Sequence, residues 1–434
     1  MKKSSFAAAA TSIPAITRGA GAKGNDKIRI AVIGCGGRGT GAALNSLLAP
    51  TTVIYPDPRN GYHTENAQPG AKIQAQGVEV VALADLFRDR LDQCRHQLAI
   101  VGNPVREDLC FTGFDAYRKV LEIPEVNCVI LASPPCFRPR ELRAAVEADK
   151  HVFMEKPAAV DAPGVRSIMK SGEIAKKKGL AIMAGTVKRH TPSFIETIRR
   201  LHDGAIGNII QAMAYFNVND MWMIPREPGW GDMEWQIRNW NYYTWLSGDC
   251  IVEQHVHMLD VANWAMQAHP VSAYGMGGLQ ARSGEEFGHT YDHFAIEYVY
   301  PDGTHLFSQN RQIAGSDRRI ANHAKGTDGS TDCMTWINSK QGEWKYDQYA
   351  HRDPYELQML SLFESIRSGQ PVNEVQAVAE STLTGIMGRE AAYSGQLIEW
   401  DAVLNSQRDY FPSELHLGDA PVPEVVLPRT YKFY

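Results

Sequence analysis

The sequence lacks the features that mark several other classes of protein. Its seven cysteines form no CxxC pair and no other metal-ligand spacing, which indicates neither a zinc ribbon nor a disulfide framework. The 44 Lys and Arg residues are scattered among 49 Asp and Glu residues, and the net charge is -5. Nucleic acid is therefore not an expected partner. No segment approaches the roughly 20 apolar residues of a membrane span, so no membrane partner is expected either.

The first 26 residues differ in composition from the rest of the chain. Two lysines precede the small and apolar stretch 6–16, and the Ala-Gly-Ala sequence at 20–22 resembles a signal-peptide cleavage site. This pattern predicts a periplasmic or secreted protein. Polar residues and a proline interrupt the apolar stretch, which leaves open a disordered N-terminal arm on a cytoplasmic protein.

A glycine-rich turn follows the first predicted strand. Residues 27–34 form the β-branched run of a strand buried in a parallel sheet, and residues 40–48 are typical of a helix. The turn between them has the GxGxxG spacing of dinucleotide-binding proteins, in which the backbone approaches a pyrophosphate at a helix N-terminus. The residues predicted to bind the cofactor here are Gly34, Gly36, Gly37, Arg38 and Gly39.

The second predicted strand, residues 78–85, ends in an acid. Asp85 is suited to bind ribose hydroxyls and would repel a 2'-phosphate, which favours NAD over NADP, although Arg88 could still reach such a phosphate. In the plain fingerprint the acid lies roughly 20 residues beyond the last glycine. Here Asp85 lies more than twice as far beyond Gly39. The Pro-, Gly- and Asn-rich segment 50–70 accounts for this excess as an inserted loop.

Strands and helices continue to alternate, which predicts a doubly wound parallel sheet in a Rossmann domain at 27–157. Ligands in such sheets bind beyond the carboxyl ends of the strands. At two of these ends lie Ser133, Pro134, Glu155 and Lys156. Alternating runs such as 272–278 and 293–300 then predict an α/β domain at 158–400 with a large open, mostly antiparallel sheet, followed by an extended tail at 401–434.

In combination, these motifs resemble the Gfo/Idh/MocA family of glucose-fructose oxidoreductase, inositol dehydrogenase and rhizopine catabolism proteins. The matching features are the glycine fingerprint, Asp85, Ser133-Pro134-Pro135, Glu155-Lys156-Pro157 and the stretch from Glu253 to Asp260. The resemblance implies an NAD(P)-dependent oxidoreductase that acts on a secondary alcohol of a sugar or cyclitol. It also implies a homo-oligomer, a dimer or tetramer built on the open sheets.

The same resemblance implies the catalytic residues. Lys156 takes the place of the active-site lysine, and His257 that of the histidine that accepts the alcohol proton as hydride leaves for nicotinamide. On a helix predicted at 249–264, Glu253 and His257 lie one turn apart. Most members carry aspartate where this chain has Glu253, which alters the reach of that carboxylate.

Further polar and aromatic residues are predicted to bind the substrate, since sugar faces stack on aromatic rings while polar groups bind the hydroxyls. The spacing of Glu253, His255 and His257 differs from the i, i+4 pattern of helical metal ligands, so we expect no metal and assign His255 to the substrate. The predicted substrate-binding residues are Arg189, Trp230, Arg238, Trp240, Glu253 and His255.

Three functions remain open on the sequence. The leading one is hydride transfer between NAD and a secondary alcohol of a sugar or glycoside, with C3 of a pyranoside as one candidate position. If the protein is exported, free NAD is scarce and a tightly bound cofactor is expected. The second is an NAD-dependent redox glycosidase, which oxidises, eliminates the aglycone, adds water and reduces again. The third is a non-catalytic sugar or dinucleotide sensor, which the presence of Lys156 and His257 disfavours.

Overall fold

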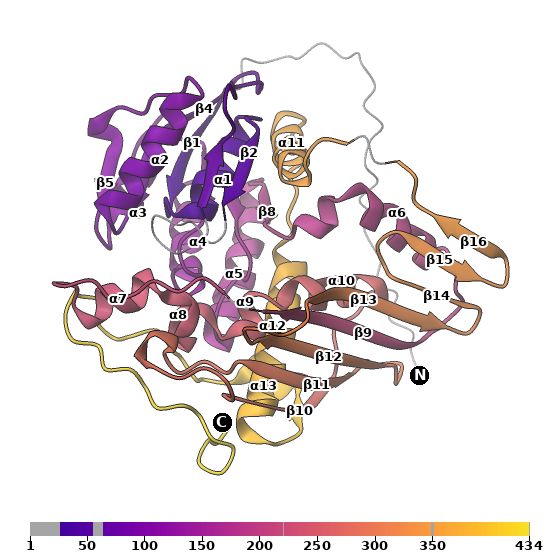
Figure 1. Ribbon diagram of the computed structural model, residues 1–434. Helices are drawn as coiled ribbons and strands as arrows, with labels where there is room; N and C mark the ends of the chain where they lie inside the picture. Colours follow the sequence, from indigo (N-terminus) through magenta and orange to yellow (C-terminus); the bar gives the residue numbers. More distant parts are fainter. Residues whose placement is uncertain (1–26, 55–63, 220, 349–350, 434) are drawn as a thin grey trace.

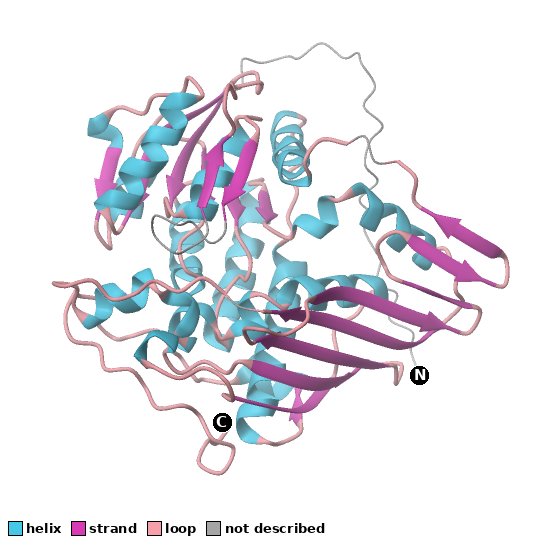
Figure 2. Ribbon diagram, in the orientation of Figure 1, coloured by secondary structure: helices cyan, strands magenta, loops and turns pink. Residues whose placement is uncertain are grey.

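The computed structural model describes residues 27–54, 64–219, 221–348 and 351–433, which form two α/β domains packed against each other (Figures 1 and 2). The signal-like segment 1–26 lies outside these residues. Among the helices of the described chain, none has both the length and the apolar content needed to cross a membrane.

The first domain is a six-stranded parallel sheet of order β5-β4-β1-β6-β7-β8. Its strands are β1 (Ile28–Ile33), β4 (Val78–Asp85), β5 (Cys110–Thr112), β6 (Cys128–Leu131), β7 (His151–Met154) and β8 (Ile182–Ala184). The apolar side chains of these strands are buried on both faces, as the continuous β-branched runs predict. The predicted Rossmann fold is confirmed, and its sixth strand lies beyond residue 157, where the sequence placed the domain boundary.

Helices cover both faces of this sheet. On one face lie α1 (Gly37–Ser46), α2 (Arg88–Ile100) and the late helix α11 (Pro354–Arg367). On the other lie α3 (Ala116–Leu121), α4 (Arg138–Glu147) and α5 (Ala162–Lys178). The carboxyl ends of β1, β4 and β6 therefore open onto the space between the helix layers, where cofactors bind in this architecture.

The predicted insertion between the first two Rossmann strands contains a small antiparallel pair, β2 (Thr51–Ile54) and β3 (Thr64–Ala67). Residues 55–63 between them lie outside the described part of the chain. The pair packs beside α1, and its Glu65 is buried against that helix. The insertion therefore adds a carboxylate next to the glycine turn.

The second domain is built on a nine-stranded sheet of order β16-β15-β14-β13-β9-β12-β11-β10-β17, in which only the β9–β12 pair is parallel. This confirms the predicted large, mostly antiparallel sheet. Its strands are β9 (Ile209–Val218), β10 (Ser272–Gly278), β11 (His293–Val299), β12 (His305–Gln312), β13 (Arg319–Gly326), β14 (Gly329–Thr331), β15 (Trp336–Ser339), β16 (Gly342–Lys345) and β17 (Ile398–Glu399).

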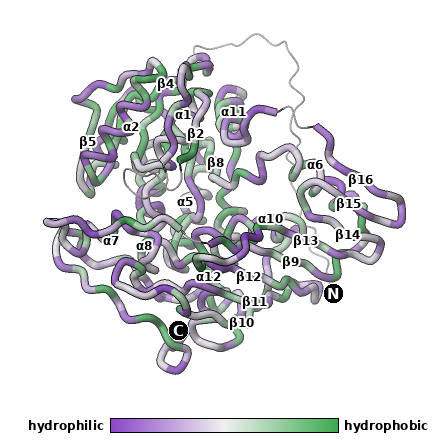
Figure 3. Tube along the Cα trace, in the orientation of Figure 1, coloured by the Kyte–Doolittle hydropathy of each residue, from purple (hydrophilic) through white to green (hydrophobic). Residues whose placement is uncertain are grey.

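Helices α10 (Val256–Met266) and α12 (Val375–Ser394) cover one face of the large sheet, and the apolar core continues from them into the Rossmann domain. The opposite face carries exposed Tyr274, Met276 and Phe307. In Figure 3 the Rossmann strand β1 is mostly hydrophobic, whereas the outer hairpin β15–β16 is mostly hydrophilic. The remaining helices of this half are α6 (Pro192–His202), α7 (Asp232–Arg238), α8 (Thr244–Ser247), α9 (Cys250–Glu253) and α13 (Trp400–Asn405).

The predicted continuous helix at 249–264 is wrong in one respect. The structure has two helices, α9 and α10, with a break at Gln254 and His255. At the break the amides of both residues donate to the carbonyl of Cys250. Such a local break turns the two helices relative to each other, so spacing along one ideal helix does not describe this segment.

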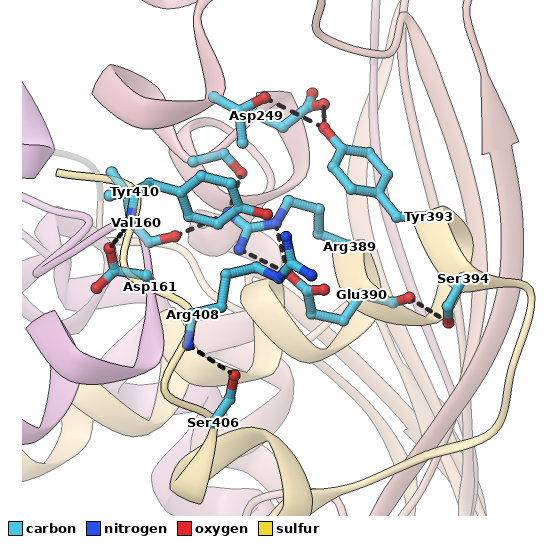
Figure 4. Close-up of polar contacts among 12 residues, drawn as sticks. Val160, Asp161, Asp249, Arg389, Glu390, Tyr393, Ser394, Ser406, Arg408 and Tyr410 are labelled. Carbon is cyan, nitrogen blue, oxygen red and sulfur yellow. Dashed lines mark hydrogen bonds and ion pairs between the residues drawn. The ribbon is translucent and has the colours of Figure 1, made fainter. Parts of the chain in front are cut away.

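The predicted extended tail at 401–434 is wrong at its start, because residues 401–405 belong to α13, whereas residues 406–433 form no helix or strand and pack on their own chain. The Tyr410 amide donates to Asp161 at 3.0 Å, and the Tyr431 hydroxyl donates to Glu390 at 2.5 Å. Glu390 also pairs with Arg389, whose guanidinium is buried and donates to the carbonyl of Val160 (Figure 4). The tail therefore lies over a buried polar cluster between the two domains.

Candidate active site

The glycine turn lines an open pocket to which residues of both domains contribute. Gly34 has φ +90°, and a Cβ there would lie 2.4 Å from the Ser133 amide nitrogen. A Cβ on Gly39 would lie 1.8 Å from the Gly34 carbonyl oxygen, whereas one on Gly36 would meet nothing within 4 Å. The first and third glycines are therefore required by packing, and the second leaves the backbone open to a ligand.

Asp85 lies at the end of β4 in the lining of the same pocket. Its carboxylate accepts hydrogen bonds from the amides of Cys35 at 2.6 Å and Phe87 at 2.8 Å. Burial raises the pKa of this carboxyl, although the positive charge of Arg90 opposes the shift. The acid therefore fixes the shape of the glycine turn as well as facing the pocket.

Two arginines follow this acid. Arg88 pairs with Asp92 at 2.8 Å and with Glu107 at 2.6 Å, whereas Arg90 lines the pocket. The arginine that lines the pocket together with Asp85 is therefore Arg90, which the sequence did not single out.

Arg38, predicted to bind cofactor, is held by carboxylates. Its guanidinium lies 2.7 Å from Glu65 and 2.8 Å from Glu155, and it stacks over the ring of Tyr355 at 4.5 Å. It contributes to the pocket wall, but most of its hydrogen-bonding capacity is committed to the protein. The predicted cofactor residue Glu155 is in turn buried against it.

Ser133 and Pro134 line the pocket as predicted by their place after β6. The Ser133 hydroxyl donates to Glu141 at 2.5 Å, and burial raises the pKa of this carboxyl to about 7. Arg138 is also buried, and it donates to the carbonyls of Ser133 at 2.8 Å and Pro157 at 2.5 Å. Neither Glu141 nor Arg138 was predicted, because their spacing matches no ligand motif.

Lys156 meets Glu253 across the domain boundary. The lysine Nζ donates to both Oε1 and the backbone carbonyl of Glu253, each at 2.7 Å. The other carboxylate oxygen, Oε2, is buried and has no hydrogen-bond partner among the described residues. The structure therefore brings these two predicted residues together and leaves one acceptor available to a ligand.

His257 lies in the first turn of α10. Burial, together with the positive charges of Lys156 and Lys188, lowers the pKa of His257 well below its usual range. Within the described chain no group is hydrogen-bonded to its imidazole, and the residue remains partly exposed. A neutral imidazole of this kind can accept a proton.

His255 lies elsewhere. It is fully buried, and its Nε2 lies 2.6 Å from the Ser308 hydroxyl of β12. Burial lowers its pKa to about 3. A side chain packed against the sheet does not fit the predicted contact with substrate, because its imidazole is bonded to Ser308 and fully buried.

Arg189 lies at the end of a short 3-10 turn, Val187–His190, and is committed to Asp260. Its Nε and Nη2 form a bidentate pair with that carboxylate at 2.9 to 3.1 Å. Asp260 is further bound by Ser381 at 2.7 Å. The neighbouring Lys188 is thus the basic residue of this turn whose positive charge contributes to lowering the pKa of His257.

The predicted substrate residues Arg238 and Trp240 line the coenzyme pocket, together with Trp222. The Trp230 ring lies 4.6 Å from the Arg238 guanidinium. Trp222, Arg238 and Trp240 come from the second domain and line the pocket together with the glycine turn, so the pocket is formed by both domains, whereas Trp230 does not line it.

Comparison with known proteins agrees with this geometry. Residues 28–186 match the model of an oxidoreductase family with an NAD-binding Rossmann fold. The chain is 22% identical to the uncharacterized oxidoreductase YrbE of Bacillus subtilis over 58% of its own length and 72% of the relative. It is 26% identical to the 2,7-anhydro-N-acetylneuraminate hydratase of Escherichia coli, but the match covers only 41% of the chain and 44% of the hydratase.

Solved structures share the fold over most of the chain. Aldose-aldose oxidoreductase from Caulobacter crescentus superposes with a TM-score of 0.63 at 16% identity, covering 86% of this chain and 100% of that one. Scyllo-inositol dehydrogenase from Lactobacillus casei, solved with NAD(H) and scyllo-inositol, gives 0.61 at 15%, covering 87% and 100%. The 3-ketoreductase KijD10 from Actinomadura kijaniata, solved with NADP, gives 0.60 at 17%, covering 85% and 98%.

Proposed function

We propose that this chain is a member of the Gfo/Idh/MocA family of NAD-binding oxidoreductases and that it transfers hydride between a secondary alcohol of a sugar or polyol and a nicotinamide coenzyme. The observation that carries the proposal is the contact between Lys156 and Glu253 across the domain boundary, which leaves one carboxylate oxygen unpaired, together with the neutral imidazole of His257, on which the charge of Lys156 acts. These are the groups that bind and deprotonate an alcohol.

The described residues fit a dinucleotide. The second glycine leaves open space over the turn, and α1 begins at Gly37 with no side chain capping its first amides. Backbone amides at a helix N-terminus bind a pyrophosphate. Asp85 faces the same pocket and would bind ribose hydroxyls. When bound, the nicotinamide ring supplies the hydride acceptor at C4.

His257 acts as the base in the oxidation direction. As the carbinol C–H bond breaks and its electron pair leaves as hydride, the hydroxyl proton passes to the neutral imidazole, so charge and atoms balance. Lys156 remains an ammonium paired with Glu253 and donates toward the reacting oxygen, which stabilises negative charge on it. Burial, together with the positive charges of Lys156 and Lys188, lowers the pKa of His257 and so favours its neutral form in the resting enzyme.

We favour NAD as the coenzyme. Asp85 is buried at the strand end and would oppose a 2'-phosphate, and this supports NAD. Arg90 lines the same pocket and is the residue that an NADP-binding site would use. A direct competition between NAD and NADP in binding decides between the two.

A second candidate function is a redox cycle in which the substrate is oxidised, loses a group, gains water and is reduced again. The relative named as 2,7-anhydro-N-acetylneuraminate hydratase favours this candidate, because that name describes no net oxidation. Oxidation at C3 of a pyranoside would acidify the neighbouring C–H and so permit elimination of an aglycone. The same His257 and Lys156 would serve both directions of hydride transfer.

Two further properties follow from sequence and surface. The exposed Tyr274, Met276 and Phe307 on the uncovered sheet face support a homo-oligomer formed through that face. The composition of residues 1–26 supports export to the periplasm or medium, where the coenzyme would have to stay bound.

The test is a panel of free sugars, polyols and aryl glycosides given to the purified protein with NAD. Formation of NADH with a sugar or polyol supports the dehydrogenase. Release of an aglycone without net NADH supports the redox cycle. Binding of NAD with neither reaction across the panel, including with inositols, would contradict the proposed function.

A further inference from the structure

We propose that Arg238 is an interdomain clamp that holds the coenzyme in its pocket. The inference rests on the proposed function, since it concerns the same nicotinamide coenzyme. It assigns Arg238 to coenzyme retention in place of the predicted role in binding substrate.

Arg238 makes three kinds of contact with the Rossmann domain. Its Nη1 and Nη2 form a bidentate pair with Asp89 at 2.9 and 3.0 Å. Its guanidinium lies 3.8 Å from the centroid of the Phe87 ring. Its backbone carbonyl accepts a hydrogen bond from Arg90 at 3.1 Å. All three partners follow directly after Asp85, the acid that faces the ribose position.

These contacts join residues of both domains in the wall of the coenzyme pocket. Phe87, Arg90, Arg238 and the neighbouring Trp240 all line it together with the glycine turn. A dinucleotide lying on that turn is therefore covered by second-domain side chains as well as by its own domain. To leave, it would require Arg238 to separate from Asp89 and Phe87.

The helix that carries Arg238 is also supported from behind. The amide of Met233 in α7 donates to the carbonyl of Gly418 at 3.0 Å, and the amide of Ala420 donates to Asp232 at 3.3 Å. Gln236 also donates to the carbonyl of Ala420. Because the C-terminal tail fixes α7, the clamp is part of a rigid wall and not of a free loop.

Ion-pair energy alone does not make the clamp effective. Asp89 is 64% exposed, and exposed pairs contribute little to stability. The contribution of Arg238 lies in its position, because one side chain joins two domains at the mouth of the pocket. Its removal should therefore change the rate at which coenzyme leaves more than it changes folding.

The experiment measures dissociation of nicotinamide coenzyme from the purified full chain. Wild type, Arg238→Ala and Asp89→Asn are loaded with NADH, and its release into excess NAD is followed by fluorescence. We expect release to become about tenfold faster in Arg238→Ala and faster by a smaller factor in Asp89→Asn, since changes at a binding site act mainly on the off-rate and the exposed ion pair contributes little by itself. The exchanged pair Arg238→Asp with Asp89→Arg should restore part of the slow release.

Arg199→Ala is the matched control. Arg199 also pairs with two carboxylates, Glu196 and Asp203, but within a single helix far from the pocket lining. This variant should release NADH at the wild-type rate. Thermal melting of every variant identifies any that fail to fold. Because the Asp89 side chain is exposed, we expect Asp89→Asn to fold, and it tests the clamp even if Arg238→Ala does not fold.

The two proposals fail in different ways. If the wild-type protein binds no NAD(H) or NADP(H), the oxidoreductase proposal is wrong and the clamp with it. If wild type binds coenzyme but Arg238→Ala and Asp89→Asn release it no faster than wild type and Arg199→Ala, only the clamp is overturned.

Discussion

The two histidines on either side of the α9–α10 break lie in opposite environments. His257 is partly exposed at the domain boundary, near two lysines, while His255 is fully buried against Ser308 of the sheet. Burial lowers the pKa of both imidazoles. The difference shows that a low pKa does not identify a catalytic base, and that access to a ligand and the surrounding charges do.

The largest expected effect separates these two histidines. His257→Asn should lower kcat by about 10²- to 10⁴-fold, because it removes the proton acceptor. His255→Asn should retain most of the turnover of the folded fraction and lose stability of about 1–3 kcal/mol, because a buried hydrogen bond is altered. Steady-state rates and urea unfolding of the two variants measure the contrast. Equal losses of turnover would contradict it.

The next effect concerns the cation beside His257. Lys156→Met should reduce kcat by about 10²-fold, since the donor to the reacting oxygen is lost. NADH binding should persist, because Lys156 is bonded to Glu253 and not to the glycine turn. Lys178→Met, which alters a lysine at the end of α5 bonded to Asp149, is the control. If the kcat of Lys156→Met equals that of wild type, Lys156 has no role in the chemical step.

Acid should weaken the protein through His255. Its folded pKa of about 3 lies below the ordinary value of 6.5, so between these values the unfolded chain binds the proton and the folded chain does not. The stability contributed by neutral His255 is therefore lost as pH falls from about 6.5 toward 3, by up to about 1.4 kcal/mol per pH unit. Urea midpoints of wild type and His255→Asn at several pH values measure this loss of stability. If the midpoints of the two proteins fall equally as pH is lowered, the loss does not come from His255.

Glu141 should act in the opposite direction. Burial raises its pKa from 4.5 to about 7, despite the Ser133 hydroxyl and the charges of Arg138 and Arg140, while Asp85 adds to the rise. Its contribution is complete below pH 4.5 and is lost as pH rises through 7, on the order of 3 kcal/mol at full ionisation. Glu141→Gln should flatten this alkaline decline in the urea midpoint. If the urea midpoint of Glu141→Gln declines at alkaline pH as much as that of wild type, the decline comes from another group.

Sequence patterns predicted the elements formed by local interactions. The strands at 78–85 and 272–278 have the predicted bounds, because apolar periodicity and flanking residues determine them locally. The glycine turn was also predictable, since each glycine serves a backbone requirement that the motif itself records.

Contacts between distant residues were not predictable in the same way. Arg238 meets Asp89 and Arg189 meets Asp260 only after the domains pack, so both arginines looked available for a substrate in the sequence. His255 was assigned to the substrate because its packing against Ser308 of the distant strand β12 is not visible in the local sequence. The family resemblance correctly brought Lys156 and Glu253 into one region, where the structure shows them bonded.

The most direct test of the account is to load wild type and His257→Asn with equal amounts of NAD and add the sugar and polyol panel. The coenzyme is then released by denaturation, and its oxidised and reduced forms are measured, together with any released aglycone. The account predicts that wild type turns over at least one substrate, while His257→Asn binds as much NAD and converts almost none. Equal conversion by both proteins would contradict the assignment of His257 as the base.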